Sequence, residues 1–255
     1  MIEKSGILYG TTTGGGPAEC GTVFQLTPPA KKGGAWTKTQ LNYFGPQPDD
    51  GGCDVNPGLI YKDPFLYGTT SRVGAGGGGT VFGLNVTEPD VFTLLYNFMT
   101  PPGDGFDPAA GVIMDGKGNL YGTTEYGGAY GSPNESTGGT VFELSATGTE
   151  TLLYSFGGYP GDGLLPAASL VMYKNNLYGT TYTGGMYGQG TVFKLTRPVK
   201  KGVPWTETIL YSFGATSDDG RAPSAGLIVD AEGNLYGTTT AGGVYGSGTV
   251  FEITP

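Results

Sequence analysis

Five carboxylate residues in or near the glycine-rich loops of this 255-residue chain could do acid–base chemistry, and they are the acids that differ between otherwise repeated segments. They are Asp107, Asp54, Glu125, Glu135 and Glu19. Glycoside hydrolysis needs such carboxyl groups in pairs, because one protonated acid serves the leaving oxygen and one carboxylate attacks the sugar or activates water. We expect Asp107 or Asp54 to be the base or nucleophile, and one of the three glutamates to be the acid.

Two basic residues, Arg72 and Arg221, fall on the same face as these acids in the arrangement derived below. We expect both to bind substrate, with Arg72 stabilising a carboxylate or binding a hydroxyl. Clustered oxygen ligands also suit Ca²⁺, although no EF-hand spacing is present. The sequence predicts no other cofactor.

Tyrosines in the same loops indicate sugar binding, because a ring with a polar tip can stack on the apolar face of a sugar. Three of them recur in Gly-Gly-x-Tyr-Gly and two more lie nearby: Tyr130, Tyr187, Tyr245, Tyr126 and Tyr182. The alternative is that these rings pack the loops against their neighbours.

The elements that must position these residues repeat five times. The phrase Leu-Tyr-Gly-Thr-Thr, followed by a glycine-rich loop and Thr-Val-Phe, starts at Leu8, Leu66, Leu120, Leu177 and Leu235. Spacings of 54 to 58 residues suit a four-stranded propeller blade. Four stretches per unit have strand character, and no segment has a helical period. The sequence therefore predicts an all-β, five-bladed β-propeller with about four antiparallel strands per blade, as a single domain over residues 1–255.

The two ends of the chain bear on how such a ring closes. The first strand of the first unit is the stub Met1–Lys4, and no fourth strand follows the stretch 251–254, so the last blade is expected to be incomplete. Either the sequence is a fragment whose native N-terminus supplied the missing strand, or the last blade has three strands. An open edge offers unpaired backbone to other chains, so an oligomer through that edge is an option.

Alternating strand directions place two kinds of loop on one face of the ring. The hairpin loop joins the second and third strands of a unit, and the linking loop leads from the fourth strand into the next unit. Acids gather on this face, whereas the opposite face collects the basic residues Lys31, Lys32, Lys62, Lys117, Lys174, Arg197, Lys200 and Lys201. Asp104, Asp162 and Asp219 recur at one offset before a proline, and we expect them to be turn residues.

The repeated phrase resembles the GloVer tandem repeats of bacterial proteins, which look like exported or surface-anchored chains. The resemblance covers nearly the whole sequence and implies a location outside the bacterial cell or on its surface. It implies no activity and no catalytic residues. Separately, Asp107-Pro108 before an innermost strand looks like the Asp-Pro that begins the first blade of several five-bladed glycosidase families.

Composition excludes several classes of chemistry. The chain has no His, so Ser-His-Asp hydrolysis and His-ligated zinc are excluded in their usual forms. A formal charge of −9 disfavours nucleic acid and anionic membrane surfaces as partners. No apolar run could span a bilayer, and Met1–Gly6 is not a signal peptide. Cys20 and Cys53 fall on the face that carries the hairpin and linking loops, and they could form a disulfide; the alternative is two free thiols.

Three functions from different classes agree with these observations. They are a glycoside hydrolase acting on a small or terminal glycoside, a lectin-like module without catalysis, and an exported adhesion or structural repeat. Equivalent pockets would favour a lectin, whereas the polar loop residues diverge between units and favour one asymmetric site. We therefore expect a glycosidase. A β-galactoside is one example of a substrate, but no residue identified here selects that sugar.

Overall fold

The fold is all-β. The computed structural model describes residues 1–47, 50–74, 77–88, 91–99, 103–131, 137–200 and 202–254. Within these ranges every regular element is a β-strand, which confirms the predicted class. The chain divides into two compact units: unit 1 is Met1–Met99 with Asp107–Val112, and unit 2 is Thr100–Phe106 with Ile113–Pro255.

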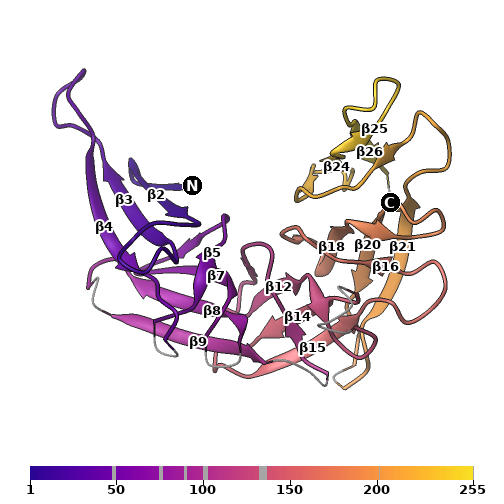
Figure 1. Cartoon of the computed structure of the whole chain (residues 1–255), viewed down its shortest axis with the longest axis horizontal. Helices are drawn as coiled ribbons and strands as arrows, with labels where there is room; N and C mark the ends of the chain where they lie inside the picture. The colour runs from indigo at the N-terminus through magenta and orange to yellow at the C-terminus, as the bar shows by residue number, and fades with distance from the viewer. Residues whose placement is uncertain are drawn as a thin grey trace. The chain divides into compact units, whose positions relative to one another are not determined.

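Unit 1 holds two antiparallel sheets, one for each of the first two repeats (Figure 1). The first sheet has the order β1 (Ile2–Lys4), β2 (Ile7–Thr12), β3 (Thr22–Thr27) and β4 (Thr37–Tyr43). The second has β7 (Phe65–Arg72) paired with β8 (Gly77–Asn85), which pairs with β9 (Phe92–Met99). Two short strands pair with the other edge of β7, namely β5 (Cys53–Val55) and β6 (Ile60–Lys62).

Unit 2 holds the sheets of the last three repeats. The third sheet has the order β11 (Ile113–Met114), β12 (Leu120–Thr124), β14 (Thr140–Leu144) and β15 (Glu150–Ser155). The fourth has β17 (Val171–Tyr173), β18 (Asn176–Thr181), β20 (Thr191–Thr196) and β21 (Thr206–Ser212). The fifth has three strands, β23 (Ile228–Val229), β24 (Leu235–Thr238) and β26 (Val250–Ile253), and no fourth strand pairs with β26 in the described residues. Each of the five repeats therefore forms one antiparallel sheet.

The two threonines of the repeated phrase have different structural roles. The second threonine pairs with the first threonine of the next strand, for example Thr181 with Thr191 at 2.8 Å between hydroxyl oxygens. The first donates to a carbonyl of the next linking loop, as Thr123 does to Ala168 at 3.1 Å. Both hydroxyls are thus used within the fold, which explains why the phrase recurs so faithfully.

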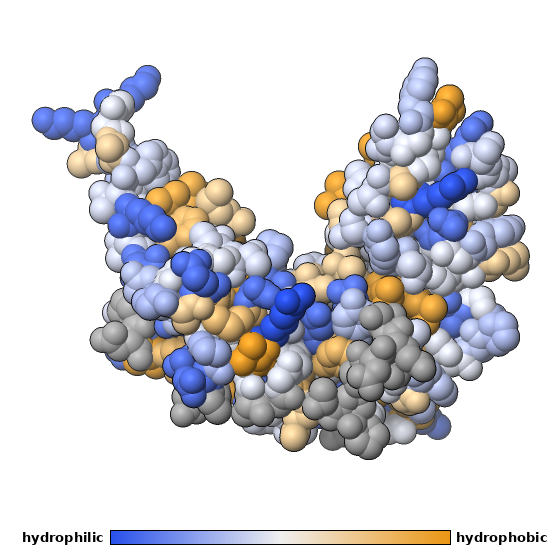
Figure 2. All heavy atoms as spheres, in the orientation of Figure 1, coloured by the Kyte–Doolittle hydropathy of each residue, from blue (hydrophilic) through white to orange (hydrophobic). Residues whose placement is uncertain are grey.

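Phenylalanines pack successive sheets together within each unit. The phenylalanine that ends one sheet lies against the phenylalanine of the third strand in the next sheet. The pairs are Phe44 with Phe82 in unit 1, and Phe156 with Phe193 and Phe213 with Phe251 in unit 2, with ring centroids 4.9 to 5.0 Å apart. The space-filling view shows a largely polar surface with small apolar areas (Figure 2). None of the described segments forms a helix that could cross a membrane.

Short ladders connect the linking loops to the hairpin loops, which the sequence pattern did not predict. They pair β10 (Gly105–Phe106) with β13 (Tyr126–Gly127), β16 (Gly163–Leu164) with β19 (Thr183–Gly184), and β22 (Gly220–Arg221) with β25 (Ala241–Gly242). In the second repeat, Cys53 pairs with Arg72 in the same way. These ladders hold the two kinds of loop side by side and so position the candidate residues.

Candidate functional site

Asp54 and Asp107 occupy the same place in two successive linking loops. Both have a positive φ, 59° and 60°, as do Leu165 and Ala222 at the equivalent positions. The backbone N–H of Asp54 donates to the Cys20 carbonyl at 3.0 Å, and those of the other three residues donate to the matching hairpin-loop carbonyls. Because Asp tolerates the left-handed region better than most residues, backbone geometry alone accounts for an aspartate at these positions.

The structure gives one ion pair within the predicted set. Arg72 Nε lies 3.4 Å from Asp54 Oδ2, with 72% and 36% of the two side chains exposed. The role of Arg72 at a substrate site stays a prediction. At this exposure such a pair contributes about 1 kcal/mol or less to stability.

A disulfide joins Cys20 and Cys53 at the junction between the first two sheets. Cys20 lies in the first hairpin loop, and its carbonyl accepts the Asp54 bond described above. The covalent bond therefore strengthens a backbone contact that the other junctions make without cysteines.

Of the three predicted acid residues, the structure describes Glu19 and Glu125. Glu19 is exposed, and its Oε2 accepts a 3.2 Å hydrogen bond from the Gly15 N–H within its own hairpin loop. Glu125 is half-buried between β12 and β13. Glu135 lies outside the described residues. Because Glu19, Asp54 and Asp107 belong to unit 1 and Glu125 to unit 2, a catalytic pair that spans the units stays a prediction.

The predicted sugar-binding tyrosines differ in exposure. Tyr126 is half-buried and stacks on Phe106 with centroids 5.3 Å apart, so its ring packs two loops together. The other four rings are exposed: Tyr130, Tyr182, Tyr187 and Tyr245. Arg221 is half-buried, and its Nε is shielded from solvent with no hydrogen-bond partner among the described residues.

Tyr187 lines a pocket of about 750 Å³ between the third and fourth repeats, which we call the tyrosine pocket. Tyr159 from a linking loop and Tyr211 from β21 line it as well, together with Met186 and Leu210. The Tyr211 hydroxyl is held by a 3.1 Å hydrogen bond to Asp219 Oδ2. Three tyrosines therefore surround one concave, largely apolar space, and the hydroxyls of Tyr211 and Tyr159 are held by carboxylates.

A second, smaller pocket of about 360 Å³, the acid pocket, shares Tyr159 with the tyrosine pocket. Glu207, Tyr154, Tyr130 and Trp205 line it. Glu207 Oε2 accepts a 2.8 Å hydrogen bond from the Tyr159 hydroxyl, whereas Oε1 is buried without a partner among the described residues. Burial raises the pKa of Glu207 to about 7; the Tyr159 hydrogen bond opposes that rise, and the Asp162 charge adds to it.

Asp162 supplies a second carboxyl group close enough to influence Glu207. Its Oδ2 accepts hydrogen bonds from the N–H groups of Gly157 and Gly158 at 2.8 and 3.0 Å, and from the Tyr154 hydroxyl at 3.2 Å. Only 4% of the residue is exposed, and burial raises its pKa against those three bonds. The turn role expected of Asp162 is therefore correct, but the residue also belongs to a coupled pair of buried carboxyl groups.

Sequence reasoning missed Glu207 because a glutamate in an outermost strand is normally a solvated residue. Thr-Glu-Thr occurs twice, and Glu150, at the equivalent place in the third sheet, also has its pKa raised to about 7 by burial and by Asp104. The repeated glutamate was the available signal. Among the described residues, no group of three or more His, Cys, Asp or Glu side chains could hold a metal ion, so calcium has no candidate site there.

The geometry defines an all-β repeat protein with aromatic and acidic pockets between successive sheets. The family model described as the Gloeobacter/Verrucomicrobia repeat matches residues 1–193 and 134–255, and the chain belongs to this family. Among curated proteins, none matches at a significant level.

Several solved structures are similar in fold. PorZ, a bacterial surface component of the type-IX secretion system of Porphyromonas gingivalis, aligns with a TM-score of 0.53 and 17% identity over 98% of this chain, which spans 31% of that protein. A candidate gluconolactonase aligns at 0.50 and 15%, over 92% of this chain and 71% of that one. A thermostable family-43 glycoside hydrolase aligns at 0.47 and 13%, over 98% and 86%. At these identities the likeness concerns the fold and not the activity.

Proposed function

We propose that this chain is a carbohydrate-binding module of the bacterial cell exterior and that it binds glycans at the tyrosine pocket. The observation that carries the proposal is the convergence of Tyr159, Tyr187 and Tyr211 on one pocket of about 750 Å³. A pocket of this size accommodates a small ligand, and aromatic rings with polar tips suit both the apolar face and the hydroxyls of a sugar. A β-galactoside specificity has no support and is not part of the proposal.

A location outside the cytoplasm has independent chemical support. The Cys20–Cys53 disulfide persists in oxidising compartments and is rare in reducing ones. The surface role of PorZ belongs to that protein and is not transferred.

The five similar sheets favour closure into one five-bladed ring. The edge through which a second copy could pair is β26, where Val250 is 82% exposed. Solution scattering tests closure, and light scattering across a concentration series tests pairing.

The binding proposal is tested with a glycan array followed by calorimetry on the best ligand. We expect Tyr187→Ala to weaken binding about tenfold, because loss of an aromatic ring that stacks on a sugar face costs about 1 kcal/mol or more. Tyr245→Ala is the matched control, since Tyr245 occupies the equivalent loop position in the fifth sheet and does not line this pocket. Equal losses in both variants, or no glycan bound by the wild type, would refute binding at the tyrosine pocket.

Glycoside hydrolysis is the second candidate function, and Glu207 is the observation that favours it. A carboxyl group with a pKa of about 7 remains protonated in weak acid and can protonate a leaving oxygen, while the nearby Asp162 offers a second carboxyl group. Glu207 lies beside the tyrosine pocket, because the acid pocket that it lines shares Tyr159 with that pocket. The catalytic pairing of Asp54 or Asp107 with one of Glu19, Glu125 and Glu135, which the sequence predicts, stays a prediction.

A panel of chromogenic glycosides tests hydrolysis separately from binding. If a glycoside is cleaved, we expect Glu207→Gln to lower kcat by about a hundredfold or more, whereas Glu150→Gln, at the equivalent strand position, should leave it within about twofold. The amide variants of Asp54, Asp107, Glu19, Glu125 and Glu135 belong in the same assay. If one of those five variants loses activity while Glu207→Gln keeps full activity, the catalytic acid is one of the five predicted from the sequence and not Glu207.

A further inference from the structure

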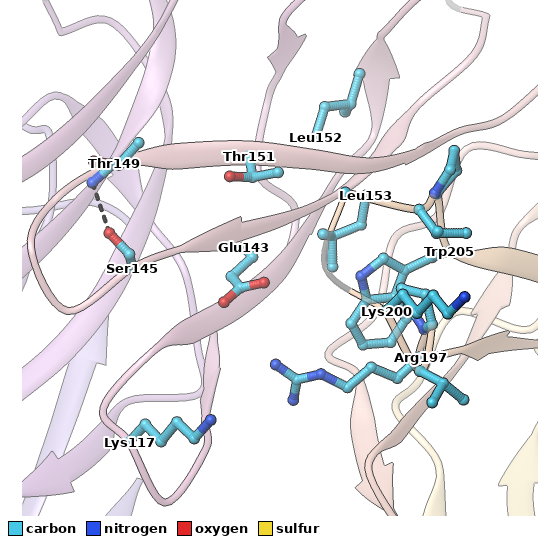
Figure 3. A pocket seen from close by; sticks show the side chains of 15 residues that line it. Lys117, Glu143, Ser145, Thr149, Thr151, Leu152, Leu153, Arg197, Lys200 and Trp205 are labelled. Atoms are coloured by element: carbon cyan, nitrogen blue, oxygen red, sulfur yellow. Dashed lines mark hydrogen bonds between the residues drawn. The ribbon is translucent and has the colours of Figure 1, made fainter.

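A further pocket of unit 2, which shares no lining residue with the tyrosine pocket, lies against the loop that joins β20 to β21 (Figure 3). Its volume is about 890 Å³. One wall comes from β14, β15 and the turn between them, and the other from residues 197–200 and 202–205. We call it the cationic pocket, because Lys117, Arg197 and Lys200 line it with Glu143 as its one acidic residue.

The positive charge of this pocket is unusual in a chain whose formal net charge is −9. Within the described ranges, the one side-chain ion pair closer than 4.0 Å is Arg72 with Asp54, so the three cations are not neutralised by a direct carboxylate partner. Figure 3 shows the Arg197 guanidinium and the Lys117 ammonium extending into the space in front of Glu143. An anion entering this space would meet uncompensated positive charge.

Arg197 is held in position before any ligand arrives. Its backbone N–H donates a 3.1 Å hydrogen bond to Asn176 Oδ1, and its guanidinium lies 5.6 Å from the centroid of the Trp205 ring. Trp205 itself packs against the buried Tyr121, with centroids 6.4 Å apart. The contact with Trp205 restricts the guanidinium, and its planar fork of donors favours recognition of a planar carboxylate.

The remaining lining indicates an organic ligand that carries hydroxyl groups, rather than a small inorganic ion. Ser145, Thr149 and Thr151 contribute hydroxyls along the β14–β15 side, and Glu143 can accept a hydrogen bond from a ligand hydroxyl. Leu153 and Trp205 contribute apolar surface. A lone sulfate or phosphate would leave most of an 890 Å³ space and its apolar walls unused.

We propose that the cationic pocket binds an acidic saccharide, that is, a glycan whose sugar units carry carboxylate groups. Arg197 and Lys117 bind the carboxylates, the hydroxyl side chains bind sugar hydroxyls, and Leu153 with Trp205 covers the apolar face of a ring. The site shares Trp205 with the acid pocket but uses none of the tyrosine-pocket residues, and it does not depend on the binding function proposed above.

Calorimetry of the full chain with a trisaccharide of galacturonic acid tests this site, with the neutral galactose trisaccharide and sodium sulfate as comparison ligands. We expect the acidic trisaccharide to bind the wild type in low salt and to bind at least about tenfold more weakly when both Lys117 and Lys200 are changed to Gln, because each charge-assisted hydrogen bond contributes a kilocalorie or more. Changing Lys31 and Lys32 to Gln is the matched control: it removes the same charge from the β3–β4 loop, and binding should stay within about twofold. Tyr187→Ala should also leave this binding unchanged.

Arg197→Lys probes recognition geometry, because it keeps the charge and removes the planar fork; we expect weakened trisaccharide binding without loss of the folded state in thermal melting. Three results would overturn the proposal. They are absence of acidic trisaccharide binding by a wild type that melts cooperatively, equal affinity for the neutral trisaccharide, and sulfate binding as tight as that of the trisaccharide. A binding loss in the Lys31/Lys32 variant as large as in the Lys117/Lys200 variant would also contradict it.

Discussion

Tyr159 and Glu207, which are 48 residues apart in the chain, are joined by a 2.8 Å hydrogen bond from the tyrosine hydroxyl to the carboxylate. The bond links a linking loop to the outermost strand of the next sheet and places an ionisable group at the boundary of two pockets. Because the other carboxylate oxygen of Glu207 is buried without a partner in the described chain, ionisation of this group in the folded state is costly.

Glu207 should make stability depend on pH in weak acid. Its pKa is about 7 in the folded state, against the ordinary value of 4.5. Between these values the folded state holds the proton more tightly than the unfolded state, so stability falls as pH rises from about 4.5 to about 7 and then levels off. Glu150 acts in the same direction, since its pKa is also raised to about 7. We expect Glu207→Gln to remove part of this slope, and the double amide variant to remove most of it.

Melting temperatures from pH 4.5 to 8 measure this slope. Glu232→Gln is the control, because it makes the same change of charge at an exposed turn residue and should leave the slope intact. A slope that is identical in the wild type and in the double variant would show that neither glutamate is buried in solution.

Asp162 and Asp219 should differ in their importance for stability although the same kinds of donor bind their Oδ2 atoms. Each Oδ2 accepts two backbone N–H groups and one tyrosine hydroxyl, but Asp162 is buried and Asp219 is half-exposed. Removing the acceptor leaves buried donors unsatisfied in one case and donors that water can reach in the other. We expect Asp162→Ala to destabilise unit 2 by about 3 kcal/mol and Asp219→Ala by about half of that. Urea unfolding measures both, and equal losses would contradict the role of burial.

Repetition made the strands predictable, because the same pattern of strand and turn residues recurs in each of the five repeats. The strand that begins near Leu66 and the three-stranded last sheet both follow from it. The acid pocket could not be predicted in the same way. Glu207 meets Tyr159 only because the start of β21 lies over the neighbouring linking loop, and the angle between sheets is not encoded by strand periodicity. For Asp107 the sequence signal and the structure differ in the opposite way. Its residue type departs from the repeat and marks it as a candidate, but its backbone has the same positive φ as Leu165 and Ala222.

The disulfide should contribute measurably to the stability of unit 1. Cys20 and Cys53 are separated by 33 residues, and a crosslink of this loop length typically stabilises a protein by about 2 to 4 kcal/mol by restricting the unfolded chain. We expect reduction, or changing both cysteines to Ser, to lower the melting temperature of unit 1, with little effect on transitions of unit 2. Thiol titration of the denatured, non-reduced chain should find no free thiol among Cys20 and Cys53. Two free thiols per chain would show that the bridge does not form.

Two glycines of one hairpin loop should respond very differently to the same substitution. Gly190 and Gly188 both have a positive φ, 99° and 72°, so alanine costs about 1 to 2 kcal/mol at either position. At Gly190 an added Cβ would also lie 2.5 Å from the Thr181 carbonyl oxygen and 2.6 Å from Pro223, whereas at Gly188 it meets nothing within 4 Å. We expect Gly190→Ala to lower the stability of unit 2 by about 3 kcal/mol or more, because Pro223 belongs to the next linking loop and the junction between the fourth and fifth sheets must shift. Gly188→Ala should cost only the left-handed penalty. Chemical unfolding of the two variants decides the matter, and similar losses in both would mean that the hairpin loop does not pack against the next linking loop as described.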